Sequence, residues 1–167
     1  LSYALKLRNM LENQKAVQSD LRESLSEITN RNERLNRISK SDELTGILNR
    51  RGFMESTKVC ILNNTGRHAA VVFADMDNLK QINDEHGHDK GDEYIKNACH
   101  FICTTFRRSA VFRIGGDEFA AVLMNEDFLN RDNLINIFNN EQEAISAAAT
   151  DPWNQLHIAA GMAVYSS

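Results

Sequence analysis

Six consecutive apolar residues, Ala69 to Ala74, are followed at once by the acidic segment Asp75-Met76-Asp77. An apolar run of this length is typical of a β-strand that is buried on both faces. Such a strand needs a layer of structure on each side of its sheet. Because the run ends abruptly at Asp75, we expect the strand to leave the core there. The segment therefore predicts a sheet at the centre of a layered domain, with carboxylates at one edge.

The segments around this strand alternate between helix and strand patterns. Apolar residues at helical spacing predict helices over about 50–63, 89–107 and 131–149, and short apolar runs predict strands over 111–114, 118–124 and 157–165. Gly115-Gly116 lies between two of these strands and predicts a tight hairpin. The order helix, strand, helix, hairpin, helix, strand is typical of an α+β sandwich, with helices against a mainly antiparallel sheet.

The first 39 residues contain neither Gly nor Pro and have a heptad pattern. Seven of the ten a and d positions are apolar, and Gln14, Ser24 and Arg31 are the polar ones. We expect a self-associating coiled coil at 1–39 and a globular domain at 40–167. A lone helix packed on its own domain is the alternative. The coiled coil is favoured because the chain has no second long amphipathic segment to act as a partner.

Composition narrows the function. The 167 residues carry a formal net charge of -4 and no Lys/Arg-rich run, which argues against a binder of nucleic acid polymers. An acidic protein can still bind an anionic nucleotide through a divalent cation. The three cysteines form no CxxC pair, so neither a disulfide framework nor a zinc ribbon is expected. No apolar stretch approaches the length of a membrane span and no signal peptide is evident. We therefore expect a cytoplasmic location. We also expect that an upstream sensor region precedes Leu1.

Two acidic groups form a candidate metal site. Asp75 and Asp77 follow one strand, and Asp117-Glu118 follow the glycines of the hairpin, so the two groups are expected to converge on adjacent strands. Carboxylate oxygens suit Mg²⁺, which also keeps waters and substrate phosphates in its shell. The glycines are expected to adopt positive φ and to let the backbone approach phosphate closely. The alternative is that these acids are simply solvated turn residues.

Four segments resemble the motifs of one enzyme family. Arg113-Ile114-Gly115-Gly116-Asp117-Glu118-Phe119 is similar to the GGDEF signature of diguanylate cyclases. Three further resemblances, in the family's order, are to its DxLTGLxNRRxF motif at 42–53, its DxDxFKxxND motif at 75–84 and its GHxxGD motif at 87–92. The resemblance implies a palm-like nucleotidyl cyclase fold and a nucleotidyltransferase that joins two GTP molecules into cyclic di-GMP. It also implies dimerisation, because each domain would hold one GTP.

The resemblance assigns roles to individual residues. The ligands of Mg²⁺, or of Mn²⁺ in its place, would be the Asp75 and Asp117 carboxylates and the Met76 carbonyl. Asp117 would also help to deprotonate the attacking 3′-hydroxyl, with Glu118 as a second catalytic group. The substrate contacts would be to guanine from Asn83 and Asp92 with His88 nearby, and to phosphate from Lys80, Arg113, Gly115 and Gly116. An Asp that accepts two guanine N–H groups favours GTP over ATP.

Several of these residues have simpler alternative roles. Asn83 is also a candidate turn cap, Asp92 a candidate cap for a helix beginning near Glu93, and Arg113 a candidate ion-pair partner for a neighbouring carboxylate. His86 and His88 alternate as in some zinc sites, although they lack a third ligand.

Two departures from the family pattern change what we expect. The family's RxxD feedback motif would fall on Phe106-Arg107-Arg108-Ser109 and matches at neither end, so product inhibition is expected to be absent or weak. The family's last helix, which supplies Lys and Arg to the triphosphate, would lie beyond Ser167. A catalytically silent GTP-binding module is therefore the main alternative to an active cyclase. A receptor for cyclic di-GMP and a pure dimerisation element explain fewer of the motifs.

Overall fold

The computed structural model describes residues 2–63 and 68–165, without the side chains of residues 2, 4 and 60–63, so the Cys60 side chain lies outside it. The chain divides into two compact units, Leu1–Ser39 and Lys40–Ser167. Helix α1, Ser2–Ser39, makes up the first unit. Taken by itself, this helix leaves its apolar a and d side chains without a partner; Met10 and Val17, for example, are 67% and 65% exposed. None of the described helices has the length and apolar character needed to cross a membrane.

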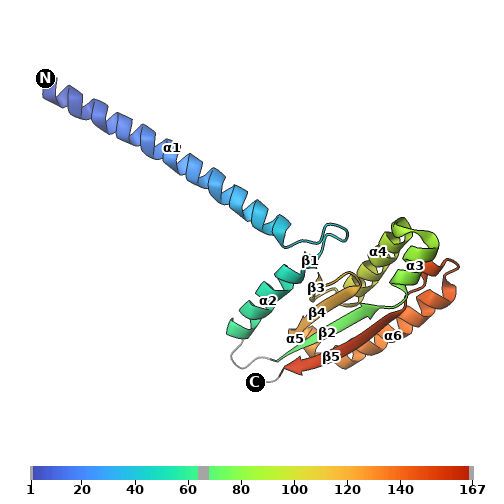
Figure 1. Cartoon of the computed structure of the whole chain (residues 1–167). Coiled ribbons are helices and arrows are strands. Elements are labelled where there is room, and N and C mark those ends of the chain that lie inside the picture. The colour runs from blue at the N-terminus through green and yellow to red at the C-terminus, as the bar shows by residue number, and fades with distance from the viewer. Residues whose placement is uncertain (1, 64–67, 166–167) are drawn as a thin grey trace. The chain divides into compact units, whose positions relative to one another are not determined.

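The second unit is built on a five-stranded sheet in the order β1-β3-β4-β2-β5 (Figure 1). Only β1 and β3 are parallel, and the other neighbouring strands are antiparallel. This confirms the predicted α+β fold with a mainly antiparallel sheet. The elements are β1 Leu48–Asn49, α2 Arg50–Asn63, β2 Ala69–Met76, α3 Leu79–His86, α4 His88–Thr105, β3 Ala110–Arg113, β4 Glu118–Met124, α5 Asn125–Leu129, α6 Arg131–Ala148, the 3-10 helix η1 Pro152–Asn154 and β5 Ile158–Tyr165.

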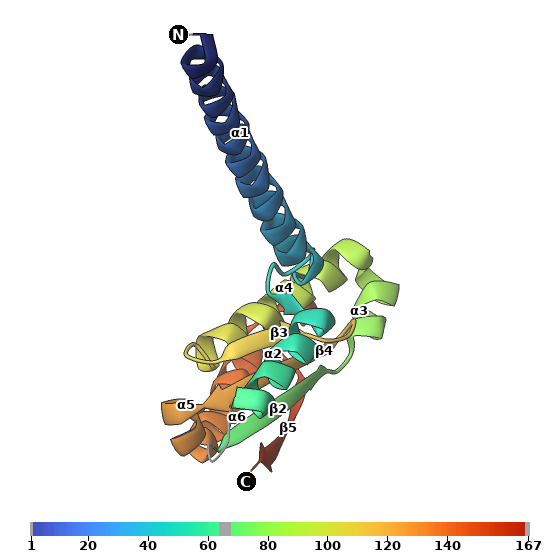
Figure 2. The ribbon, with the colours of Figure 1, turned by 90° about the vertical axis from the view of Figure 1, so that its left-hand side faces the viewer.

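Helices α4 and α6 cover one face of the sheet, and α2 lies on the other face (Figures 1 and 2). The larger core lies beneath α4, where Tyr94 and Phe101 join alternate residues of β2 and β4. On the α2 side, the Phe53 ring packs edge-on against Phe112 with ring centroids 5.3 Å apart. Strand β4, which is buried from Phe119 to Leu123, is therefore packed on both faces.

Strand β2 corrects one prediction, because it is not buried on both faces. Its residues alternate, with Ala70, Val72, Ala74 and Met76 buried while Phe73 is 46% exposed. The physical reason is that α2 packs over β1 and β3 and leaves the β2–β5 half of that face largely open. The run looks uniformly apolar because Val71 and Phe73 lie on the less buried face, where Phe73 contacts only the edge of α2 through Phe53.

Two short helices, α3 and α5, were not predicted. Helix α3 has eight residues and lies between Asn78, with a φ of 66°, and Gly87, with a φ of 87°. Eight residues span about two turns, which is too short for helical periodicity to be recognised. The helix after it begins at His88 and ends at Thr105, close to the predicted 89–107.

The buried Tyr94 of α4 fixes the end of β2 in place. Its hydroxyl donates to the Asp77 carbonyl at 2.9 Å and accepts from the His157 N–H at 3.2 Å. The Asp77 N–H in turn donates to the His157 carbonyl at 2.8 Å. Burial raises the pKa of Tyr94, so the hydroxyl stays protonated and available as a donor. The acidic segment that follows β2 is thus held by α4 and by the start of β5.

Candidate active site

The acidic ends of β2 and β4 lie side by side, as the sequence predicted. Asp75 and Glu118 are directly opposite each other in the antiparallel pair. The Met76 N–H donates to the Asp117 carbonyl at 3.0 Å, which ties the hairpin turn to the end of β2. A cavity of about 90 Å³ lies against both Asp75 and Glu118. It has room for a few water-sized groups, so a nucleotide would have to lie outside it.

The Gly115–Asp117 turn is closed by its own backbone. The N–H groups of Ile114 and Gly115 donate to the Glu118 carbonyl at 2.8 and 3.2 Å. A Cβ at Gly115 would lie 2.2 Å from Oε2 of Glu118, whereas one at Gly116 would meet nothing within 4 Å. The predicted positive φ was wrong for both glycines. A side chain at position 115 would displace the Glu118 carboxylate, and Gly116 leaves an open backbone surface beside the turn.

In the part of the chain that the structure describes, the acidic edge offers too few ligands to enclose a metal ion, so it suits a divalent cation that keeps water and phosphate in its coordination shell. Like charges directly opposite on adjacent strands are destabilising, and a cation beside Asp75 and Glu118 would remove that cost. Among the described residues there is no group of three or more His, Cys, Asp or Glu side chains that could hold a metal ion. Mg²⁺ often uses one or two carboxylates and completes its shell with water and phosphate. The described carboxylates therefore fit Mg²⁺ that is carried with a nucleotide.

The residues expected to contact guanine come together where α3 meets α4. Asn83 lies inside α3, so it does not act as an N-cap, and its side chain packs against Gly91 of α4. Asp92 is exposed in the second turn of α4, which begins at His88. The alternative that Asp92 caps this helix is therefore wrong. Residues four apart share one helix face, so His88 and Asp92 lie on the same side of α4.

From the role that the family resemblance implies for Asn83, replacing Gly91 by alanine is expected to raise the KM for GTP by about 10-fold while kcat changes little. The new Cβ would lie 1.9 Å from Oδ1 of Asn83, so the amide must move. The amide is the end of a side chain and can move at small cost, but it loses its orientation for a hydrogen bond worth about 1–1.5 kcal/mol. Steady-state kinetics and a thermal melt test this. The control is Gly161→Ala in β5, where a Cβ would meet nothing within 4 Å, and an unchanged KM in Gly91→Ala would contradict the prediction.

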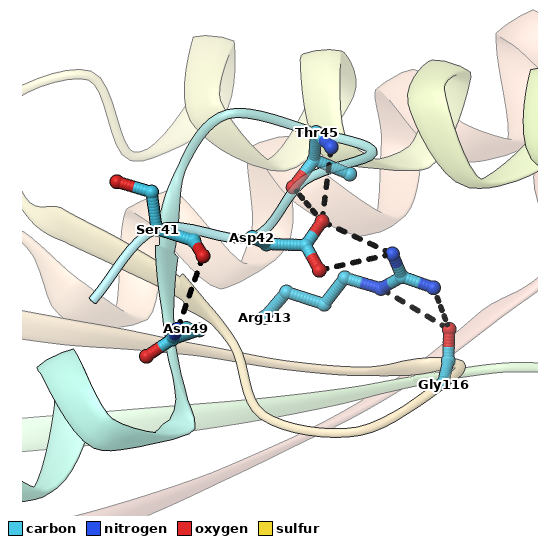
Figure 3. Close-up of polar contacts among 6 residues, drawn as sticks. All are labelled: Ser41, Asp42, Thr45, Asn49, Arg113 and Gly116. Carbon is cyan, nitrogen blue, oxygen red and sulfur yellow. Dashed lines mark hydrogen bonds and ion pairs between the residues drawn. The ribbon is translucent and has the colours of Figure 1, made fainter. Parts of the chain in front are cut away.

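Arg113 connects the start of the globular unit to the hairpin turn. Its Nη1 donates to Oδ1 of Asp42 at 3.0 Å, and its Nη2 and Nε donate to the Gly116 carbonyl at 2.6 and 3.2 Å (Figure 3). The Arg113 side chain is 12% exposed and that of Asp42 is 21% exposed. The guanidinium thus pairs with a neighbouring carboxylate, the alternative to its predicted phosphate contact. Its three nitrogens hold protein groups that position the turn.

Asp42 is itself held by the loop that it begins. Its Oδ1 accepts from the Thr45 backbone N–H at 2.9 Å and from the Thr45 hydroxyl at 2.6 Å. Burial opposes ionisation of Asp42, but the hydrogen bonds from Thr45 and Arg113 outweigh burial and lower its pKa. The ionised carboxylate therefore joins the loop to Arg113. Sequence reasoning missed this pair because 71 residues separate its members.

A second cluster that the sequence did not reveal lies at the α3–α4 junction, where guanine contacts are predicted. Trp153 of η1 packs edge-on against His86 with ring centroids 5.1 Å apart, and Nζ of Lys90 lies 4.3 Å from the Trp153 ring centroid. Nδ2 of Asn97 donates to the Trp153 carbonyl at 3.2 Å. The indole therefore braces the α3–α4 junction from a distant part of the chain. Lys80, by contrast, is exposed on α3, where no described contact restrains it.

The family model described as "Diguanylate cyclase, GGDEF domain" matches residues 39–167, which is most of the chain. The chain belongs to this GGDEF family. The GGDEF domain is 41% identical over 85 residues to the diguanylate cyclase DosC of Escherichia coli, an alignment that covers 49% of this chain and 18% of DosC. It is 36% identical over 103 residues to the cyclic di-GMP phosphodiesterase NbdA of Pseudomonas aeruginosa, covering 59% of this chain and 13% of NbdA.

Solved structures agree on the fold. The GGDEF domain and its preceding helix resemble the coiled coil and GGDEF domain of DgcB from Caulobacter crescentus, solved with c-di-GMP, with a TM-score of 0.74 and 20% identity. That alignment covers 90% of this chain and 82% of the DgcB chain. The chain spans less than a third of the length of the curated relatives that it matches, for example 27% of the E. coli diguanylate cyclase DgcP. Activity and partners of the whole protein are therefore matters for proposal.

Proposed function

We propose that this GGDEF domain is a diguanylate cyclase that condenses two GTP molecules into cyclic di-GMP and releases two pyrophosphates. The observation that carries the proposal is the pairing of Asp75 with Glu118 across β2 and β4, with Asp117 tied to the same edge. These acids occupy the family's motif positions. Their mutual repulsion favours a cation beside them, and GTP would bring its phosphates to that cation.

One group of side chains binds the guanine of GTP, and another binds its phosphates and the metal ion. Asn83 and Asp92 bind the guanine edge, with His88 on the same face of α4, and their distance from the acidic edge sets where the triphosphate lies. Lys80 is free to swing toward the phosphates, which also pass the open backbone at Gly116. Bound Mg²⁺, or Mn²⁺, held by Asp75, Asp117 and the Met76 carbonyl, would neutralise developing charge at the α-phosphate.

Each domain presents one acidic edge and one guanine end, so the reaction needs two domains. The 3′-hydroxyl of one GTP attacks the α-phosphate of the other, and pyrophosphate leaves. Asp117 accepts the proton of the attacking hydroxyl, with Glu118 beside it. Holding the two nucleotides face to face converts an encounter in solution into an aligned attack within a dimer.

Incubation of the full chain with GTP and Mg²⁺ tests the proposal. Pyrophosphate and a cyclic guanine dinucleotide are expected together, and Asp117→Ala should yield neither. ATP in place of GTP should give no product, because adenine lacks the donor pair that Asp92 accepts. GTP binding without product would instead support a silent GTP-binding module. A silent GTP-binding module is the second candidate, because one matched relative is named as a phosphodiesterase and not as a cyclase.

We further propose that α1 mediates a homodimer through a coiled coil and carries a signal from an upstream sensor. Its apolar heptad side chains find no partner within their own unit. Burying them against a second copy is the simplest way to remove them from water. The polar Gln14, Ser24 and Arg31 in the seam weaken the pairing, which leaves its strength adjustable.

Removal of residues 1–38 is expected to lower cyclase activity by about 10-fold or more at low micromolar concentration, and the loss should shrink as concentration rises. The reason is that the helix supplies an effective concentration of the second domain. Activity against protein concentration and sedimentation equilibrium measure the effect. Leu21→Asp, at an a position, should behave like the truncation, whereas Ser19→Asp, outside the seam, should not. Equal activity of the full and truncated chains at low concentration would overturn the idea.

A further inference from the structure

A second cavity lies beside the loop that holds Arg113. It has a volume of about 350 Å³, and Gly46, Ile47, Leu48, Cys103, Arg107 and Val111 are among its lining residues. Cys103 belongs to the last turns of α4 and is half-buried. The cavity thus offers one partly accessible thiol and one guanidinium, and the catalytic proposal uses neither.

Cys103 is paired with a second thiol one helical turn earlier. Cys99 is buried, with 6% of its surface exposed, as its apolar helical spacing predicted. A hydrogen bond from Cys99 lowers the pKa of Cys103 to about 7, although partial burial opposes this. The same hydrogen bond, together with burial, raises the pKa of Cys99. Cys103 lines the cavity and is half-buried, whereas Cys99 is buried, so Cys103 is the thiol of the pair that a reagent can reach.

The cavity is physically connected to the catalytic turn. Ile47 lines the cavity and packs against the core cluster that includes Cys99. Thr45 belongs to the tight loop 42–47, which is closed by the Asp42 N–H donating to the Ile47 carbonyl at 2.8 Å and the Gly46 N–H donating to the Asp42 carbonyl at 2.9 Å. This one loop supplies both the cavity wall at Gly46 and Ile47 and the carboxylate that holds Arg113. A group inserted beside Cys103 must therefore press on the loop that positions Gly116.

We propose that Cys103 is a modification site for small anionic disulfides, and that the resulting mixed disulfide slows the cyclase through loop 42–47. The second half of this statement rests on the proposed function. In the reaction, the Cys103 thiolate attacks one sulfur of the small disulfide. The new Cys103–S–S–R bond forms as the old S–S bond breaks, and the other half leaves as a thiolate. Arg107 supplies positive charge in the cavity for a carboxylate-bearing reagent. An excess of free thiol reverses the step.

Oxidised glutathione added to the full chain provides the test. Intact mass and peptide mapping at pH 7 are expected to show one glutathionyl adduct at Cys103, removed by dithiothreitol and missing in Cys103→Ser. A Cys60→Ser background keeps the third thiol from contributing. Cys99→Ala should slow adduct formation by about threefold or more, because the thiolate loses its donor. An adduct that maps to Cys99, or an unchanged rate in Cys99→Ala, would overturn the site.

The coupling to the turn is measured separately from catalysis. Hydrogen exchange at the amides of Ile114 and Gly115, which donate to the Glu118 carbonyl, should accelerate in the adduct and not in Cys103→Ser treated in the same way. The modified chain should also form cyclic dinucleotide at least about threefold more slowly. Unchanged exchange in a fully modified chain would refute the coupling. A chain that makes no product before modification refutes the proposed function alone, because the adduct and the exchange rates still decide the thiol site.

Discussion

Replacing Asp75 by asparagine is expected to lower cyclic dinucleotide formation by about 100-fold or more and to stabilise the fold at the same time. The loss of activity follows from removing one of the carboxylates that would hold the divalent cation at the developing charge. The gain in stability, about 0.2–1 kcal/mol, follows from removing the like charge opposite Glu118 in the β2–β4 pair. Product assays and urea unfolding measure the two effects.

Opposite signs for activity and stability separate this prediction from a general loss of structure. Glu143→Gln provides a control, because it removes one exposed carboxylate from the middle of α6. It should leave activity and unfolding nearly unchanged. Mg²⁺ should stabilise the parent chain more than Asp75→Asn. Activity of Asp75→Asn within threefold of the parent would show that the cation is held elsewhere.

The sequence was most informative where a residue's role depends on its neighbours in the chain. Strand β4, Glu118–Met124, has the predicted limits because its apolar run is bounded by a glycine turn and a polar segment. The convergence of Asp75 with Glu118 also followed from local signals, since both groups end or begin a strand that pairs with its neighbour. Such local patterns were enough to predict the sheet and its acidic edge.

Contacts between residues far apart in the chain could not be predicted from such local patterns. Nothing in the spacing of Asp42 and Arg113 links two residues 71 positions apart, and the same holds for Tyr94 and His157. The burial of β2 was misjudged for a related reason, because the exposure of Phe73 depends on how far α2 extends across the sheet. The sequence thus predicted that the acidic segments meet at one edge of the sheet, while the contacts that hold them in position emerged only from the fold.

One of those contacts gives the second large prediction. Replacing Arg113 by methionine is expected to lower the free energy of unfolding at pH 7 by about 1–3 kcal/mol and to reduce cyclase activity. The variant leaves the mostly buried Asp42 ionised without its cation, and the Gly116 carbonyl loses its donors. Arg51→Met is the matched control, because it removes an exposed ion pair with Glu55, which should contribute under about 1 kcal/mol.

The dependence on pH identifies Asp42 as the cause. Its pKa is lowered in the folded state, so its ionisation stabilises the fold above the unfolded pKa of about 3.9, and this stability is lost as pH falls through the folded value. Because Arg113 contributes to that lowering, the difference in stability between the parent and Arg113→Met should shrink as the pH falls below about 4. In an Asp42→Asn background, Arg113→Met should lower the free energy of unfolding by less, and this decrease should depend little on pH. If Arg113→Met lowers the free energy of unfolding equally in the parent chain and in Asp42→Asn, then Arg113 stabilises the turn through Gly116 alone.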